Sequence, residues 1–281
     1  MTVSEKFLDL TDKKIKQVIA TGDIHGNFNP LHYDVKSRIP NNSAVVVCGD
    51  IGLGFNRKRY YLDTFKSINQ DLIDRNVYFI FLRGNHDDPE YFVFGHDDEW
   101  DINYTHIIIV PDYTVIKFNE DVTALCIGGA VSVDRQWRMN ENKSWWKNEG
   151  VQIPNYEDLE SYLIEYRPNT VFSHTATSHH ELSVGGVGEA YFDKMKELGD
   201  QTLKDDLDAE RKLMDEIYDY ISARTEINVW ICGHFHFSSS KIETDPDTGH
   251  ETEFRVLDML RDPFYSKRKT LGEYFTVGKE K

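Results

Sequence analysis

Acidic, amide and imidazole side chains recur in this chain where apolar, strand-like runs end, and there they could bind divalent cations. Five such junctions supply seven oxygen or nitrogen donors: Asp23, His25, Asp50, Asn85, His174, His234 and His236. Seven donors are enough for two cations, whereas one zinc site would need only three or four of them. Because no thiolate is among them, the set favours borderline to hard ions such as manganese, iron or zinc.

The spacing of these donors supports a shared metal site. Asp23 and His25 stand two residues apart, and so do His234 and His236. Residues i and i+2 of an extended chain point to the same side, so each pair can contact one ion. Either pattern alone is a weak signal. Asp50 adds a carboxylate, whose two oxygens can bridge two cations as no histidine can.

The stretch Gly84-Asn85-His86-Asp87 directly follows the apolar run 77–82 and Arg83. Its amide, Asn85, offers a neutral carbonyl oxygen to a hard cation, and His86 carries a group that titrates near neutral pH. The stretch therefore combines a metal donor with a possible proton donor at the end of one strand.

Continuous apolar runs lead into each junction and predict buried strands. They occupy residues 17–20, 44–48, 77–82, 170–173 and 228–232. Amphipathic segments between them predict helices at 31–38, 59–74 and 155–166. Alternating strands and helices are typical of a parallel sheet, which places ligands at the carboxyl ends of its strands. The candidate donors are therefore predicted to meet at that edge.

The rest of the chain predicts additional strands and a helical excursion. Residues 107–110, 114–118 and 122–127 are expected to form antiparallel hairpins, so the sheet system is mixed. A helical excursion is expected at about 185–225; a cover helix is favoured, and a lid or an assembly surface are the alternatives. We expect residues 1–281 to form one domain, with a C-terminal tail from about residue 261 that wraps an edge.

Two arginines stand in a predicted polar loop after Gly128 and Gly129. Arg135 and Arg138 can hold phosphate oxygens in bidentate fashion, so they are candidate substrate-binding residues together with Asn85. Equally, the two guanidinium groups can pair with the surplus of acidic side chains. The nearby tryptophans at 145–146 could stack on a base, although a place in the core is favoured.

Composition limits the partners and the compartment. The chain of 281 residues has 48 acidic and 32 basic side chains and a net charge of −16, so no general nucleic-acid binding is expected. No apolar run approaches the roughly 18 residues of a membrane span, and the start lacks a signal-peptide pattern, so no membrane association is expected. Three cysteines stand in apolar runs without CxxC spacing, which predicts reduced thiols and a cytoplasmic protein: Cys48, Cys126 and Cys232.

Taken in order, the motifs resemble those of the calcineurin-like metallophosphoesterases. They are Asp-x-His, Gly-Asp, Gly-Asn-His-Asp, His and Gly-His-x-His, and they run from Asp23 to His236. The resemblance implies a four-layer α/β/β/α sandwich of two mixed sheets flanked by helices. It also implies two divalent metal ions, one bound by Asp23, His25, Asp50 and His236, and the other by Asp50, Asn85, His174 and His234.

The resemblance further implies a mechanism. A hydroxide that bridges the two metals would attack phosphorus in line, with Asp50 as the bridging carboxylate. His86 would act as an acid beside the leaving group rather than as a metal ligand. Protein serine/threonine phosphatases and dinucleoside tetraphosphatases carry an Asp and an Arg where this chain has Leu53 and Gly54. The segment 128–138, with the two tryptophans and Glu149, resembles uncharacterised bacterial and phage metallophosphoesterases more closely.

Three functions remain open from the sequence. The favoured one is hydrolysis of a phosphomonoester in a small molecule, a nucleotide or a phosphoprotein. The alternatives are a phosphodiesterase or nuclease, and a scaffold whose metal site is not used for chemistry. The scaffold is disfavoured because none of the seven donors of the motif set is lost.

Overall fold

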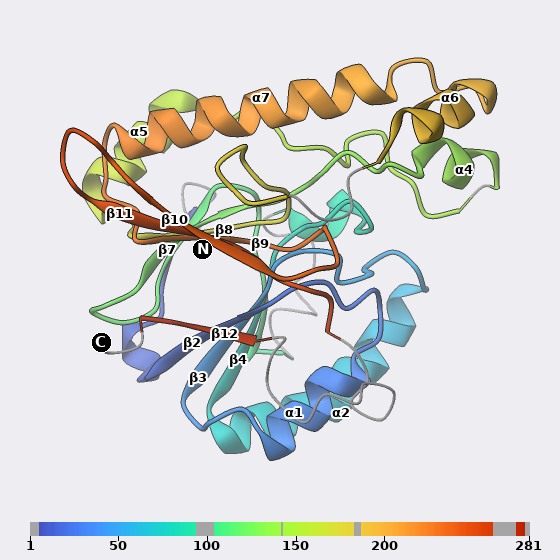
Figure 1. The fold of residues 1–281 in the computed structure, drawn as a ribbon. Coiled ribbons are helices and arrows are strands. Elements are labelled where there is room, and N and C mark those ends of the chain that lie inside the picture. Colours follow the sequence, from blue (N-terminus) through green and yellow to red (C-terminus); the bar gives the residue numbers. More distant parts are fainter. Residues whose placement is uncertain (1–5, 94–103, 142, 183–186, 261–273, 279–281) are drawn as a thin grey trace.

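Two β-sheets pack face to face, and helices cover the outer face of each (Figure 1). The structure, a computed structural model, describes residues 6–93, 104–141, 143–182, 187–260 and 274–278. Each sheet contains both parallel and antiparallel pairs. The predicted four-layer α/β/β/α sandwich of two mixed sheets is therefore confirmed.

The five-stranded sheet has the order β12-β2-β3-β4-β5. Its strands are β2 (Gln17–Thr21), β3 (Ser43–Val47), β4 (Val77–Phe81), β5 (Ile107–Ile109) and β12 (Tyr274–Val277). Strands β2 to β5 are parallel, and β12 pairs antiparallel to β2 at the edge. Two helices lie against its outer face in Figure 1: α1 (Asn29–Ser37) and α2 (Lys58–Arg75).

The seven-stranded sheet has the order β1-β6-β7-β8-β9-β11-β10. Its strands are β1 (Phe7–Asp9), β6 (Thr114–Lys117), β7 (Thr123–Ile127), β8 (Thr170–Ser173), β9 (Val229–Cys232), β10 (Ser239–Thr244) and β11 (Glu251–Val256). Strands β7, β8, β9 and β11 are parallel neighbours. Its outer helices are α5 (Tyr156–Tyr166) and α7 (Leu203–Ser222), with α4 (Arg135–Asn140) and α6 (Glu189–Glu197) near one end of α7 (Figure 1).

The central strands are apolar throughout because both of their faces are buried. In β3, Val45 belongs to the same buried cluster as Phe65 of α2. The neighbouring Ala44 belongs to the cluster between the two sheets, together with Ile231 of β9. On the other side of β9, Trp230 faces α5 and α7. These contacts fix the two sheets against each other and hold the ends of their parallel strands in place.

One predicted connection is wrong. Residues 107–110 were expected to form an antiparallel hairpin with 114–118, but β5 pairs in parallel with β4 and β6 belongs to the other sheet. The chain crosses from one sheet to the other between them. Pro111 and Asp112 are typical of a turn, and such a local pattern cannot distinguish a hairpin from a crossover between packed sheets. The second predicted hairpin, β6 with β7, is present.

Three other segments refine the predictions. Arg135 and Arg138 lie on a short helix, α4, rather than in an irregular loop. The helical excursion consists of α6 and α7, and residues 183–186 lie outside the described residues. Of the C-terminal tail, residues 261–273 also lie outside them, and 274–277 form the edge strand β12. Within the described ranges, every helix is too short or too polar to cross a membrane.

Candidate metal centre

The seven predicted donors all lie in loops that follow the carboxyl ends of parallel strands. The loops follow β2, β3 and β4 in one sheet and β8 and β9 in the other. Because the two sheets pack face to face, these loops meet at one edge of the sandwich. Groups of donor atoms there lie within 4.8 Å of one another: Asp23, His25 and His236; His25, Asp50 and His86; Asp50, His174 and His234.

The first group joins the loops after β2 and β9. His236 Nε2 lies 2.9 Å from Asp23 Oδ2 and 3.0 Å from His25 Nε2. The other oxygen of the Asp23 carboxylate accepts the backbone N–H of His234 at 2.9 Å, which ties the two loops together. Two loops distant in the sequence therefore direct three donor atoms to one point.

The third group contains Asp50, His174 and His234, and hydrogen bonds orient the ring of His174. Its Nδ1 lies 2.7 Å from the carbonyl oxygen of Cys48, so Nδ1 must donate there. Its Nε2 faces two oxygens, Asn85 Oδ1 at 2.8 Å and Asp50 Oδ1 at 3.2 Å. The amide of Asn85 is oriented by Nδ2, which donates to Ser132 Oγ at 2.8 Å. One ring nitrogen and two oxygens thus converge, an arrangement that a cation between them satisfies when Nε2 carries no proton.

Asp50 belongs to two of these groups, one with His25 and His86 and the other with His174 and His234. Its Oδ1 faces His174, and its Oδ2 lies 3.9 Å from His25 Nδ1. Oδ1 also accepts the backbone N–H of His86 at 2.8 Å. The residue is 1% exposed, so the orientation of its carboxylate is fixed by the surrounding protein rather than by solvent. It directs one oxygen to each group, as a bridging ligand must.

Backbone strain is concentrated at these residues. Among the few non-glycine residues with positive φ are His25, Asp50, His234 and His236, with φ between 45° and 69°. Such conformations cost about 1 to 3 kcal/mol each and persist only where the surroundings impose them. Here they turn four donor side chains out of their strand ends toward a common centre.

Residue 84 is a glycine because the loops after β3 and β4 approach each other closely at this position. A Cβ atom there would collide with the backbone N and with Oδ1 of Asp50. The loops after β3 and β4 are therefore pressed together without space for a side chain. This contact brings Asn85 and Asp50 to the same His174 ring.

The electrostatics of the site fit divalent cations. Among the described residues, every ion pair of Asp23 and Asp50 is with a histidine, and none is with lysine or arginine. Burial alone would raise the pKa of Asp50, but His174, His86 and His25 hold that pKa well below its usual range. Burial likewise opposes protonation of His174, yet Asp50 raises its pKa to about 9. The buried carboxylate thus attracts positive charge at the point where the donors meet.

Asp87 is a residue of this site whose role the sequence did not reveal. Its fully buried carboxylate accepts four backbone N–H groups, those of Gly84, Ile51, Gly52 and Leu53, at 2.7 to 3.1 Å. Burial and the nearby charge of Asp50 raise the pKa of Asp87 to about 7. Asp87 thus holds the loop after β3 against the loop after β4. The sequence feature that could have identified Asp87 is its position at the end of Gly84-Asn85-His86-Asp87.

Arg138 lies directly behind His86. Its Nη1 is 3.0 Å from His86 Nδ1 and donates to Ser132 Oγ at 3.0 Å. Its Nη2 donates to the carbonyl of Asn85 at 3.2 Å and to Glu149 Oε2 at 3.3 Å. Burial, and then the charge of Arg138, lower the pKa of His86, while Asp50 opposes the shift. Arg138 therefore lies beside the donor groups, and its role in substrate binding stays a prediction.

Arg135 has different surroundings. Its guanidinium binds both oxygens of Asp200 at 2.7 and 2.8 Å and Asp206 at 2.7 Å. These contacts support the alternative in which Arg135 pairs with acidic side chains and joins α4 to the start of α7. A role for Arg135 in substrate binding stays a prediction.

Helix α7 does more than cover the sheet. Glu210 accepts the backbone N–H of Val131 at 2.6 Å, and Arg211 donates to the carbonyls of Ala176 and Thr177. One turn further, Asp215 accepts the N–H of Ser178 at 2.7 Å. The helix therefore fixes the loop that follows His174.

The two other histidines of that loop lie apart from the donor groups. His179 Nδ1 pairs with Glu243 at 2.6 Å, and His180 Nδ1 meets the N–H and hydroxyl of Thr177. Neither belongs to a group that could hold a metal among the described residues.

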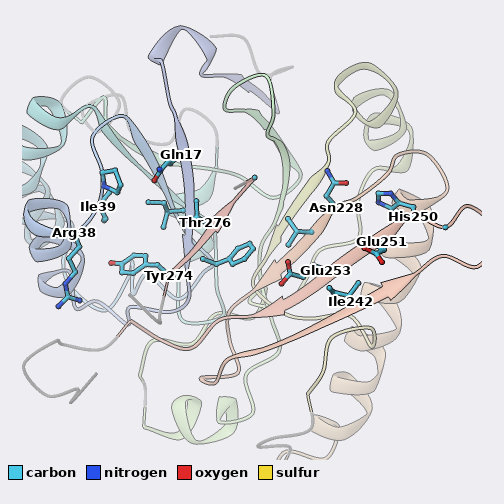
Figure 2. A pocket seen from close by; sticks show the side chains of 16 residues that line it. Gln17, Arg38, Ile39, Asn228, Ile242, His250, Glu251, Glu253, Tyr274 and Thr276 are labelled. Carbon is cyan, nitrogen blue, oxygen red and sulfur yellow. The ribbon is translucent and has the colours of Figure 1, made fainter. Parts of the chain in front are cut away.

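A wide groove lies away from this centre. This open groove of about 1270 Å³ includes Gln17 at the start of β2 and Asn228 just before β9, at the amino ends of strands whose carboxyl ends carry the donors. Figure 2 shows Arg38 and Tyr274 on one side of it and Glu253 on the other. This groove therefore does not coincide with the candidate metal centre.

The chain is similar to solved structures over most of its length, at low sequence identity. A protein of Thermus thermophilus is similar at 14% identity and TM-score 0.49, covering 88% of this chain and 90% of that chain. A dimetal phosphatase from Danio rerio is similar at 13% identity and TM-score 0.47, covering 88% of each chain. No curated protein matches the chain.

The sequence model of the calcineurin-like phosphoesterases matches residues 16–238, most of the chain and all of the donor loops described above. The chain therefore belongs to the calcineurin-like phosphoesterase family.

Proposed function

We propose that this protein hydrolyses phosphomonoesters with two divalent metal ions bound at the edge where the two sheets meet. The observation that carries the proposal is the position of Asp50, whose two oxygens face two separate groups of donors. The proposed ligands are the seven donors of the sequence motifs: Asp23, His25, Asp50, Asn85, His174, His234 and His236. Manganese, iron or zinc would suit this set of oxygen and nitrogen donors.

Bound there, the two ions would lower the pKa of a water molecule and neutralise the charge of the phosphate. The chain supplies the orientation. Cys48 fixes the tautomer of His174, and Ser132 fixes the amide of Asn85. Such contacts behind the ligands keep a site in one geometry, and losing one typically costs about 10- to 100-fold in affinity or activity.

His86 and Arg138 are proposed to act on the phosphate and its leaving group. His86 belongs to the group with His25 and Asp50, and its ring centroid lies 5.2 Å from that of His25. Arg138, on the far side of His86, brings a fixed positive charge. A phosphate bound next to them would offset that charge and favour the protonated imidazole.

Monoester preference is tested with the metal-loaded protein. Phenyl phosphate and diphenyl phosphate present the same leaving group, and we expect the monoester to have the larger kcat/KM with each of Mn²⁺, Fe²⁺ and Zn²⁺. A preference for the diester would replace the proposal by a phosphodiesterase. The net charge of −16 argues against a nucleic-acid substrate.

We predict that Arg138 contributes more to the reaction than Arg135. Arg138→Ala should lower kcat/KM by about 10- to 100-fold, the loss of one charge-assisted contact. Arg135→Ala breaks the ion pairs with Asp200 and Asp206, so it should lower the melting temperature while changing kcat/KM less than about 3-fold. Kinetics, metal content and thermal unfolding are measured on both variants to test this prediction. A larger kinetic loss in Arg135→Ala would assign substrate binding to Arg135 instead.

We also propose a cytoplasmic location and a phosphorylated small molecule, nucleotide or phosphoprotein as substrate. Three cysteines are free and buried, which suits a reducing compartment: Cys48, Cys126 and Cys232. Localisation of the tagged protein in its own cells tests the compartment.

A further inference from the structure

An exposed aromatic side chain, Phe55, lies next to the candidate metal centre. Phe55, in the loop between β3 and α2, is 37% exposed. Its ring centroid is 6.0 Å from that of His86, and the two rings are nearly perpendicular. A Cβ atom built on Gly26 would touch the Phe55 ring at 3.4 Å, and Gly26 directly follows His25. Phe55 therefore lies next to two of the loops that carry donors.

Hydrogen bonds from Tyr61 hold the loop that carries Phe55 in place. This tyrosine is fully buried. Its hydroxyl accepts the backbone N–H groups of Gly54 and Asn56 at 3.0 and 2.9 Å and donates to the carbonyl of Gly52 at 2.6 Å. The residues held by these three bonds lie on both sides of Phe55 in the sequence. The bonds therefore fix the backbone before and after the exposed ring.

Two further contacts complete this support. The indole of Trp146 packs so closely on Gly54 that a Cβ atom there would lie 2.6 Å from it. The loop carbonyl of Leu53 accepts the N–H of Asp88 at 2.7 Å. An exposed aromatic ring on an immobilised loop loses little conformational entropy when a second ring stacks on it. The loop thus presents a preorganised apolar surface beside His86.

We propose that Phe55 is a stacking surface that selects phosphate esters whose leaving group carries a planar unsaturated ring. The proposal rests on the proposed phosphoesterase function and adds a substrate class to it. With the phosphate at the donors and the ester oxygen toward His86, the leaving group extends past Phe55. A phenolic ring and a nucleobase share the required chemistry, and the test distinguishes them.

The kinetic test compares Phe55→Leu and Phe55→Trp with the parent on three substrates: phenyl phosphate, a nucleoside 5′-monophosphate and glycerol phosphate. Phe55→Leu should lower kcat/KM for ring-bearing esters by about 3- to 10-fold, the usual contribution of an aromatic pair. Glycerol phosphate should be unaffected, and Phe55→Trp should retain the parent's preference. A loss on phenyl phosphate alone assigns a phenolic ring, and a loss on the nucleotide alone assigns a nucleobase. Equal losses on all three substrates would overturn the proposal.

A binding measurement separates this proposal from the phosphoesterase function itself. Calorimetry on the metal-loaded protein should show phenylphosphonate binding more tightly than methylphosphonate, and Phe55→Leu should remove the difference. Tyr33→Leu, at an exposed aromatic residue on α1, is the matched control and should keep it. If the parent binds both phosphonates equally, Phe55 is not a stacking surface. If the parent hydrolyses no ester but prefers phenylphosphonate, only the proposed reaction fails.

Discussion

Asp50→Asn is expected to abolish turnover and to remove at least one equivalent of metal from the protein. The substitution keeps the shape of the side chain but removes the charge and one of two oxygens that face His174 and His25. A neutral amide cannot bridge two cations, and its NH₂ group would point at one of them. We expect kcat/KM to fall by at least about 10³-fold, the upper range for loss of one group that stabilises charge. Elemental analysis and kinetics are measured on the same preparation.

Two controls make this result specific. Asp63→Asn, at an exposed carboxylate on α2 that pairs with Arg59, should keep both metals and full activity. Thermal unfolding of Asp50→Asn in the presence of a chelator shows whether the variant still folds. Two retained equivalents of metal with full turnover would remove the bridging role from Asp50, and the proposed two-metal function would need another shared ligand.

The donors were predictable because each stands where a buried strand ends. Periodicity locates strands such as β3 and β4, and parallel strands bring their carboxyl ends to one edge. The types of Asp50, Asn85 and His174 then indicate cation chemistry. No knowledge of side-chain contacts is needed for this step, which is why the fold class and the grouping of the donor loops could be predicted.

The surroundings of the donors could not be predicted in the same way. Asp87 accepts backbone N–H groups from a loop more than 30 residues away, and nothing in its own neighbourhood indicates this. Arg135 and Arg138 stand three residues apart in similar sequence, yet one faces Asp200 and the other His86. Residues three apart lie on the same face of a helix, so the sequence does not distinguish the two arginines, and only the packing of α4 decides which one reaches His86. The crossover between β5 and β6 escaped prediction for the same reason.

His86→Asn is expected to show whether His86 protonates the leaving oxygen. General acid catalysis typically contributes about 10²- to 10⁴-fold, and the loss should be of this size for alkyl phosphates. Nitrophenyl phosphate should lose distinctly less, because its leaving group hardly needs a proton. Across a series of esters, log kcat/KM should therefore depend more steeply on the leaving-group pKa in the variant than in the parent. Both metals should be retained.

The position of His86 makes this experiment decisive. Its backbone N–H is bound to Asp50 and its Nδ1 faces Arg138, so the ring is fixed from two sides whether it donates a proton or only stabilises charge. Equal losses on alkyl and nitrophenyl esters would mean that it stabilises charge or positions the phosphate. Loss of a metal would make His86 a ligand, as its place in the group with His25 and Asp50 allows. His179→Asn, at a histidine that pairs with Glu243 away from the donors, is the matched control and should leave the leaving-group dependence unchanged.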